Sequence, residues 1–527
     1  MNHDRGGQQS QWRLSTSAAD GIRTAFFCKS ESLSEEGLRE MIERHGLAPN
    51  NHNVDDYYFF YQACKNERVT EGIIRYLLEY FPDAASVANK EGNVSLHWAC
   101  ENKNVTLNLV QLLIDAAPES IRRANNCGDM PINVLCANED VGKMTAIKIL
   151  KFLLMKYPEA VRQTDEDGRH PIHIAASWGG YPEFCHVLIE AYPGSERLTT
   201  NSGRLPLYNA CLWNTVAMVE YLYELYPEAI HLTTTKGHYP IHAAIQYMKR
   251  RDNHETALEI VQFLLASDPS VKLQKYLGRS LLHFACRRTY DDSSIQAALE
   301  VINVIYDSNP EAIEENVLIS GIEGYHQEVQ AFLNGELVYA RHAKDNRHMT
   351  TPDMNGQLPL HRALQNNIRL GSIKLLVEGN PAALQSADNS DALPLHVACM
   401  HHDSSEVIDY LVGLDPSTLD AVDGEGNAAL HLACRNARHG IIALFLEKYG
   451  AVSVSTRNAD KKLPIELLWE SVPVEDRESI GYIENVYRLL RANPGMMMGI
   501  GAQTLRSPAS TSSTLPCQTG KKRKFGQ

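Results

Sequence analysis

Histidine and cysteine recur together, three residues apart, at four places in the chain. The pairs are His97 with Cys100, His283 with Cys286, His396 with Cys399, and His431 with Cys434. Residues three apart lie on one face of an α-helix, so each pair could offer an imidazole nitrogen and a thiolate to a metal ion. A zinc site needs about four such ligands around one point. What the pairs can do therefore depends on the elements that hold them.

The pairs belong to a ten-residue motif that recurs along most of the chain. Examples are EGNVSLHWAC at 91–100, DGRHPIHIAA at 167–176, NGQLPLHRAL at 355–364 and EGNAALHLAC at 425–434. The second residue of each string, usually glycine, is called here the anchor; the anchors are 56, 92, 128, 168, 203, 237, 278, 356, 391, 426 and 461. Most intervals are 34 to 41 residues, but 78 residues separate 278 from 356. We therefore expect a degenerate, helical copy between 320 and 355.

The sequence of each repeat predicts two short helices, followed by a connector that leads to the next anchor. The first helix begins near the motif proline, which suits the first helical position because its missing N–H costs nothing there. The second is amphipathic, with apolar residues on one stripe. A proline follows it ten residues before the next anchor, at Pro82, Pro118, Pro158, Pro193, Pro227, Pro381 and Pro416. We expect the connector to be a long irregular arm and not a β-hairpin.

The motif resembles that of the ankyrin-repeat family, D-G-x-T-P-L-H-x-A-A at a period of about 33 residues. Histidine occupies the motif position at His97, His173, His242, His283, His361, His396 and His431. The resemblance covers 56–495 and implies an all-α, ankyrin-type α-solenoid of about twelve stacked helix-turn-helix repeats. It also implies binding to other proteins and no intrinsic catalysis. The family's threonine, which caps the first helix and helps to hold the histidine, is mostly lost here, so the partner of the histidine is an open question.

The repeat register predicts an organisation in six parts. These are a disordered N-terminus at 1–30, a capping helix and linker at 31–55, an N-terminal repeat block at 56–320, a degenerate repeat or joint at 321–355, a C-terminal repeat block at 356–495, and a disordered tail at 496–527. A capping helix is expected because the open end of a stacked array must be covered.

Composition and motif searches narrow the function. Hydrophobic residues are 44% and charged residues 22%, as in soluble folded proteins, and the net charge of −14 disfavours direct nucleic-acid binding. We expect no membrane span, because no apolar run of about 18 residues occurs. Seven of eleven cysteines share one repeat position, which favours small buried side chains over a disulfide framework. No phosphate-binding loop, nucleophile elbow or kinase motif occurs, so we expect a monomeric, non-enzymatic protein without a cofactor.

Three functional hypotheses follow. The first is a protein-interaction scaffold that binds through its connector tips, where the residues flanking the anchors should be the most accessible. The candidates are Glu166, Arg169, His170, Lys236, His238, Tyr239, Gln357, Asn389 and Glu425. The second is a nuclear adaptor in transcription, directed by the basic run Lys521, Lys522, Arg523 and Lys524; localisation is then cytoplasmic, nuclear or both. The third is a metal- or redox-responsive protein using the histidine and cysteine positions.

Overall fold

The computed structural model describes residues 36, 58–179, 181–247, 254–288, 290, 294–313, 325–344, 349–450 and 453–493. The chain divides into two compact units, residues 1–333 and 334–527. The division falls inside helix α18 (Gln327–Lys344), in the stretch where the motif is missing. The described residues 327–344 of this stretch are helical, as the sequence predicts. The two units are described separately below.

Paired helices build the first unit. The first helices of its repeats are α3 (Tyr58–Lys65), α5 (Ser95–Glu101), α7 (Pro131–Cys136), α9 (Pro171–Trp178), α11 (Pro206–Trp213), α13 (Pro240–Tyr247) and α15 (Leu281–Cys286). The second helices are α4 (Glu71–Tyr80), α6 (Leu107–Ala116), α8 (Lys143–Lys156), α10 (Pro182–Ala191), α12 (Val216–Leu225), α14 (His254–Ser267) and α16 (Ile295–Ser308). First helices pack on first helices of the neighbouring repeats, as α11 does on α9 and α13.

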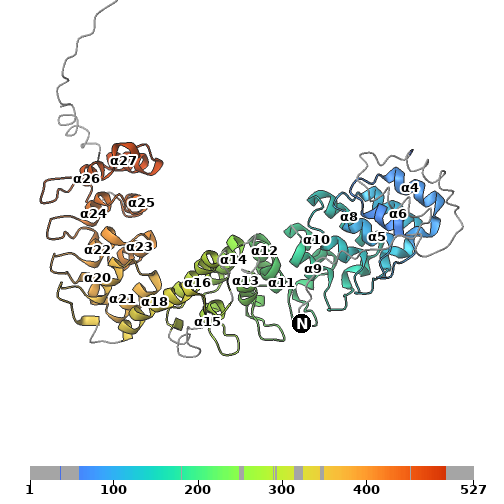
Figure 1. Ribbon diagram of the computed structural model, residues 1–527, viewed down its shortest axis with the longest axis horizontal. Helices are drawn as coiled ribbons and strands as arrows, with labels where there is room; N and C mark the ends of the chain where they lie inside the picture. Colours follow the sequence, from blue (N-terminus) through green and yellow to red (C-terminus); the bar gives the residue numbers. More distant parts are fainter. Residues whose placement is uncertain are drawn as a thin grey trace, which may run out of the picture. The chain divides into compact units, whose positions relative to one another are not determined.

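The second unit repeats this arrangement. Its first helices are α20 (Pro359–Gln365), α22 (Pro394–His401), α24 (Ala429–Arg435) and α26 (Pro464–Ser471), and its second helices are α21 (Leu370–Gly379), α23 (Ser405–Leu414), α25 (His439–Lys448) and α27 (Ile480–Ala492). The connectors of this unit project on the side of the first helices, away from the second helices (Figure 1). The described residues contain no named strand, and the all-α solenoid of stacked helix pairs predicted from the sequence is confirmed.

Local sequence explains where the helices begin and what they bury. The motif proline stands at the start of its helix at Pro131, Pro171, Pro206, Pro240, Pro359, Pro394 and Pro464, as predicted. On α8 the stripe Ile149, Leu150 and Leu153 is at most 1% exposed. Burying each such side chain contributes roughly 1.5–3 kcal/mol, which a lone amphipathic helix could not gain. Stacking of the repeats therefore supplies the stability of these short helices.

The connectors are more regular than the sequence argument expected. After the second helix ends, a single 3₁₀ turn follows at Pro82–Ala85, Pro118–Arg122, Pro158–Arg162, Ser195–Arg197, Pro227–His231, Pro269–Leu273, Pro381–Gln385 and Pro416–Leu419. The start of the connector is therefore more regular than predicted, while the prediction that it is not a β-hairpin is confirmed for the described residues, which contain no named strand. Proline disfavours helical conformation in the residue before it, which ends the helix, and its fixed φ suits the first position of a new turn. At Tyr226, for example, φ is −146° and ψ is 76°.

Most connectors end in a tight turn that is joined to a neighbouring turn by a backbone hydrogen bond. At the 168 turn, the Asp165 carboxylate accepts the backbone N–H groups of Asp167 and Arg169 at 3.0 and 2.8 Å. The backbone N–H of Glu166 donates to the carbonyl of Cys127 in the preceding turn, at 3.1 Å. The same contact joins Asn201 to the carbonyl of Asp167 at 3.0 Å. Successive tips are joined by such backbone hydrogen bonds from anchor 92 to anchor 237 in the first unit and from anchor 356 to anchor 461 in the second.

The anchor residue takes a left-handed backbone conformation even where it is not glycine. Its φ is +73° at Gly168, but also +53° at Asp391 and +63° at Lys461. Glycine adopts this region without steric cost, whereas a side chain there is strained. We expect Lys461→Gly to raise the free energy of unfolding by about 0.5–1 kcal/mol, as measured by urea denaturation.

The matched change is Gly168→Ala, which should lower the free energy of unfolding by 1 kcal/mol or more, on the order of other strained-backbone effects. A Cβ atom there would lie 2.9 Å from the backbone nitrogen of Asn201 as well as at positive φ. If Lys461→Gly destabilises the protein, or Gly168→Ala leaves it unchanged, the anchor conformation is not the constraint described here.

Candidate binding face and the motif histidines

The motif histidines accept a hydrogen bond at the helix starts, where the side-chain cap of the family's threonine is absent. At the start of six first helices, a backbone N–H donates to the histidine Nδ1 three residues later, at 3.0 to 3.2 Å. Since Nδ1 accepts, Nε2 carries the proton. In five of the six histidines it donates to a carbonyl in the following connector, whereas the buried Nε2 of His242 has no hydrogen-bond partner among the described residues. The donors and acceptors are His97 with Asp129, His173 with Leu198, His361 with Ala392, His396 with Ala421, and His431 with Thr456, at 2.9 to 3.3 Å. The histidine therefore links its own helix to the next connector.

His283 departs from this pattern. The Arg279 guanidinium donates to its Nε2 at 2.8 Å, and the Ser280 hydroxyl accepts its backbone N–H at 3.3 Å. Ser280 is the one motif position where a hydroxyl similar to the family's threonine remains. The cap at this repeat is therefore a serine side chain, and the histidine is available to orient an arginine.

Burial sets the protonation of the motif histidines and of the cysteines that pair with some of them. It lowers the pKa of His97 and of His173 to about 4, and that of His242 to about 3. It raises the pKa of Cys100 to about 12 and that of Cys434 still further. Metal binding needs deprotonated thiols, and these thiols stay protonated at neutral pH. Within the described ranges, no group of three or more His, Cys, Asp or Glu side chains could hold a metal ion.

The nine candidate residues do lie at connector turns or helix starts, but they are not all accessible. Glu166, Lys236, Asn389 and Glu425 are exposed. Arg169, His170, His238, Tyr239 and Gln357 are half-buried, so the expectation that all nine are among the most accessible was wrong. The reason is packing between successive turns. His238 stacks on Tyr276 of the next connector with ring centroids 4.0 Å apart, for example.

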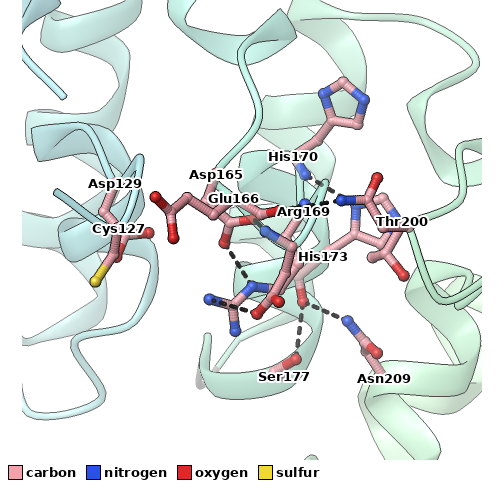
Figure 2. A network of polar contacts seen from close by, with 12 residues as sticks. Cys127, Asp129, Asp165, Glu166, Arg169, His170, His173, Ser177, Thr200 and Asn209 are labelled. Carbon is pink, nitrogen blue, oxygen red and sulfur yellow. Dashed lines mark hydrogen bonds and ion pairs between the residues drawn. The ribbon is translucent and has the colours of Figure 1, made fainter. Parts of the chain in front are cut away.

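The arginine charge at the 168 turn is neutralised locally, as Figure 2 shows. The Arg169 Nε atom lies 2.5 Å from a carboxylate oxygen of Asp165, whose side chain is 1% exposed. A second guanidinium nitrogen lies 3.6 Å from Asp167. In the same view the carbonyl of His173 accepts hydrogen bonds from Ser177 and Asn209. This turn therefore presents little net charge from its arginine.

A family model described as ankyrin repeats, in three copies, matches residues 135–236 and 373–458. The chain contains ankyrin repeats. Ankyrin repeats are protein–protein interaction modules, and the family is generally non-enzymatic. No curated protein matches the sequence.

The repeats at anchors 237 and 278 gather aromatic rings that the sequence argument only partly identified. His238 and Tyr239 were named as candidates, and His238 brings Tyr276 beside it. The ring of Phe284 meets the edge of His242 at 4.7 Å. Tyr276 and Phe284 were missed because each repeat was examined for its motif and not for what two repeats place together. A comparison of adjacent units at equal distance from the anchor could have found them.

Two further predictions concern the two ends of the chain and the expected absence of a membrane span. The basic run Lys521–Lys524 and most of the expected capping helix lie outside the described residues. Among the helices that the structure describes, none is both long and apolar enough to cross a membrane.

Proposed function

We propose that the protein is a non-enzymatic scaffold or adaptor that binds a partner protein through its connector face. This face is defined as the connector turns together with the adjoining starts of the first helices. The observation that carries the proposal is the edge of backbone hydrogen bonds between successive tips, such as Glu166 to Cys127 and Asn389 to Asn355. It holds the turns in a fixed series, while their side chains differ from unit to unit. A rigid frame with variable side chains is suited to selective protein recognition.

The test is native co-purification of the tagged full chain from its own cells. We expect a partner at a fixed stoichiometry that survives size-exclusion chromatography. A charge-reversing set at exposed tips, Glu166→Lys with Glu425→Lys, should change how much partner is recovered. Their counterparts on second helices, Glu224→Lys with Glu447→Lys, should not. No stoichiometric partner in repeated preparations, together with substrate turnover by the purified chain, would contradict the proposal.

A second proposal, favoured by the basic run at the end of the chain, is a nuclear adaptor in transcription. Import receptors read short extended lysine-rich segments, and Lys521–Lys524 supplies one. Replacing these four residues by alanine should move a fluorescently tagged protein from the nucleus to the cytoplasm. The matched control is Lys461→Ala with Lys462→Ala, a basic pair in which Lys462 pairs with Glu470 at 2.6 Å. An unchanged distribution after the tail substitution would exclude the tail as the address.

A further inference from the structure

A pocket of about 500 Å³ opens on the connector face at anchor 278. Its lining consists of Tyr276, Leu277, Arg279, His283, Phe284, Arg287 and Arg288. Three of these seven side chains are guanidinium groups, and two are aromatic rings. The carbon at the centre of the Arg288 guanidinium lies 5.4 Å from the ring centroid of Phe284, a cation–π distance. The pocket therefore combines positive charge with flat apolar walls.

The arginines of this pocket lack carboxylate partners. Arg279, Arg287 and Arg288 make no ion pair with any residue that the structure describes. The buried Nε of Arg288 has no hydrogen-bond partner within that same set, and burial lowers the pKa of this guanidinium. A half-buried cation without a counter-ion is costly unless something supplies the charge. These guanidinium groups would therefore be stabilised by a bound anion.

Equivalent positions in other repeats show what is missing. Arg169 and Arg279 both follow their anchors directly, but the positions of Asp165 and Asp167, which neutralise Arg169, hold Lys275 and Leu277 in the 278 repeat. Leu277 is 78% exposed and takes a φ of +51°, both unfavourable for leucine. The local counter-ions of the arginine have thus been replaced by a cation and an exposed apolar side chain.

The presence of Leu277 in place of a carboxylate also affects a second arginine of the pocket, Arg287. Arg287 lies nine residues after its anchor, where the 426 repeat has Arg435. Arg435 pairs with Glu425 at 3.0 Å. Glu425 directly precedes its anchor, and Leu277 occupies the same position before anchor 278. One changed connector therefore leaves two arginines without partners.

The positive charge extends over three consecutive repeats. No Asp or Glu occurs in 198–213, 232–247 or 273–290, which run from each connector through its first helix. These stretches contribute Arg204, Lys236, Lys275, Arg279, Arg287 and Arg288 instead. Asp291 and Asp292 follow in the sequence, outside the described residues. In a chain of net charge −14, this is a concentrated basic patch.

We propose that this pocket binds an acidic segment of a partner protein, with a carboxylate or phosphate group placed among Arg279, Arg287 and Arg288 and an adjoining side chain against Tyr276 and Phe284. The proposal rests on the protein-binding function proposed above and specifies the chemical class of the partner segment that is bound. Guanidinium groups bind carboxylates and phosphates through paired, charge-assisted hydrogen bonds. Leu277, exposed at the rim, offers the segment an apolar contact.

A short acidic peptide fits this surface better than a nucleic acid does. A nucleic acid needs a basic track along its phosphates. Here the 168 turn, the last one before the three basic repeats, carries Asp165, Glu166 and Asp167. A long polyanion leaving the pocket toward the 168 turn would meet carboxylates. A peptide can present its acidic group and then continue with neutral or basic residues.

The test uses fluorescence anisotropy with the full chain and three labelled probes. These are a ten-residue peptide containing six glutamates, the same peptide with one phosphoserine at its centre, and a single-stranded oligonucleotide of equal net charge. We expect both peptides to bind, with weaker binding at higher salt. Arg287→Glu, at an exposed residue, should weaken peptide binding roughly tenfold or more, as should Arg288→Ala. A gain from the phosphoserine would identify phosphate as the preferred group.

The matched control is Arg435→Glu, the equivalent arginine that already has a carboxylate partner. It should leave peptide binding unchanged, and equal circular dichroism spectra will show that the variants fold. No peptide binding, equal weakening by Arg435→Glu, or tighter binding of the oligonucleotide than of either peptide would overturn the proposal. If a native partner binds the wild type and Arg287→Glu equally well, the pocket assignment fails while the scaffold function stands. If the peptides bind but no native partner is found, the scaffold function fails alone.

Discussion

Lowering the pH from 7 to 4 should destabilise the folded array by several kcal/mol. Burial lowers the pKa of His97 and His173 from 6.5 to about 4, and that of His242 to about 3. Between about pH 4 and pH 6.5 the folded state therefore binds fewer protons than the unfolded chain does. Stability from these groups is fully present above about pH 6.5 and is lost as the pH falls toward 4. For His97 and His173 the full loss is roughly 3 kcal/mol each.

Urea denaturation at pH 7, 6, 5 and 4 measures this effect. A variant with His97→Gln, His173→Gln and His242→Gln should be less stable at pH 7, because the caps are weakened. Its stability should then fall less steeply between pH 6 and 4 than that of the wild type, because glutamine does not titrate. Equal steepness in the two proteins would show that the motif histidines do not govern acid unfolding.

Truncating Ile149 to alanine should lower the free energy of unfolding by about 2–5 kcal/mol, because it leaves a cavity in a fully buried stripe. In a stacked array each repeat contacts only its neighbours, so the damage should stay local. Hydrogen exchange should accelerate in α8 and in the adjoining α6, α7 and α10, and not in α20 to α27. Lys148→Ala, at an exposed residue on the same helix, should change stability by no more than about 0.5 kcal/mol. Faster exchange throughout both units would contradict nearest-neighbour stacking.

The sequence predicted the helices well because the motif is periodic and its proline has a fixed preference. Pro171 and Pro394 begin their helices as expected, and the stripe on α8 is buried as expected. It predicted the connectors poorly. Pro118 and Pro158 recur at a fixed distance before the anchor and begin 3₁₀ turns. Proline also occurs in irregular turns, so its position alone does not distinguish a 3₁₀ turn from an irregular arm.

The candidate site was predicted only in part, since binding surfaces depend on which residues from different repeats meet. Lys236, His238 and Tyr239 were singled out from one connector. The arginine pocket beside them needs the comparison of Lys275 and Leu277 with Asp165 and Asp167 at equal distance from their anchors. That comparison uses sequence alone and finds the unpaired charge. The volume of the pocket and the stacking of His238 on Tyr276 need three dimensions.

Site-specific photocrosslinking in the native cell tests the central claim, that the connector face binds a partner protein. A photoreactive residue is placed at Lys236, exposed on the connector of the 237 repeat, or at Glu224, exposed on second helix α12. We predict a single, reproducible protein crosslink from position 236, lost when Arg287→Glu is added, and none from position 224. Crosslinks from position 224 alone, or identical crosslinks from both, would contradict the account.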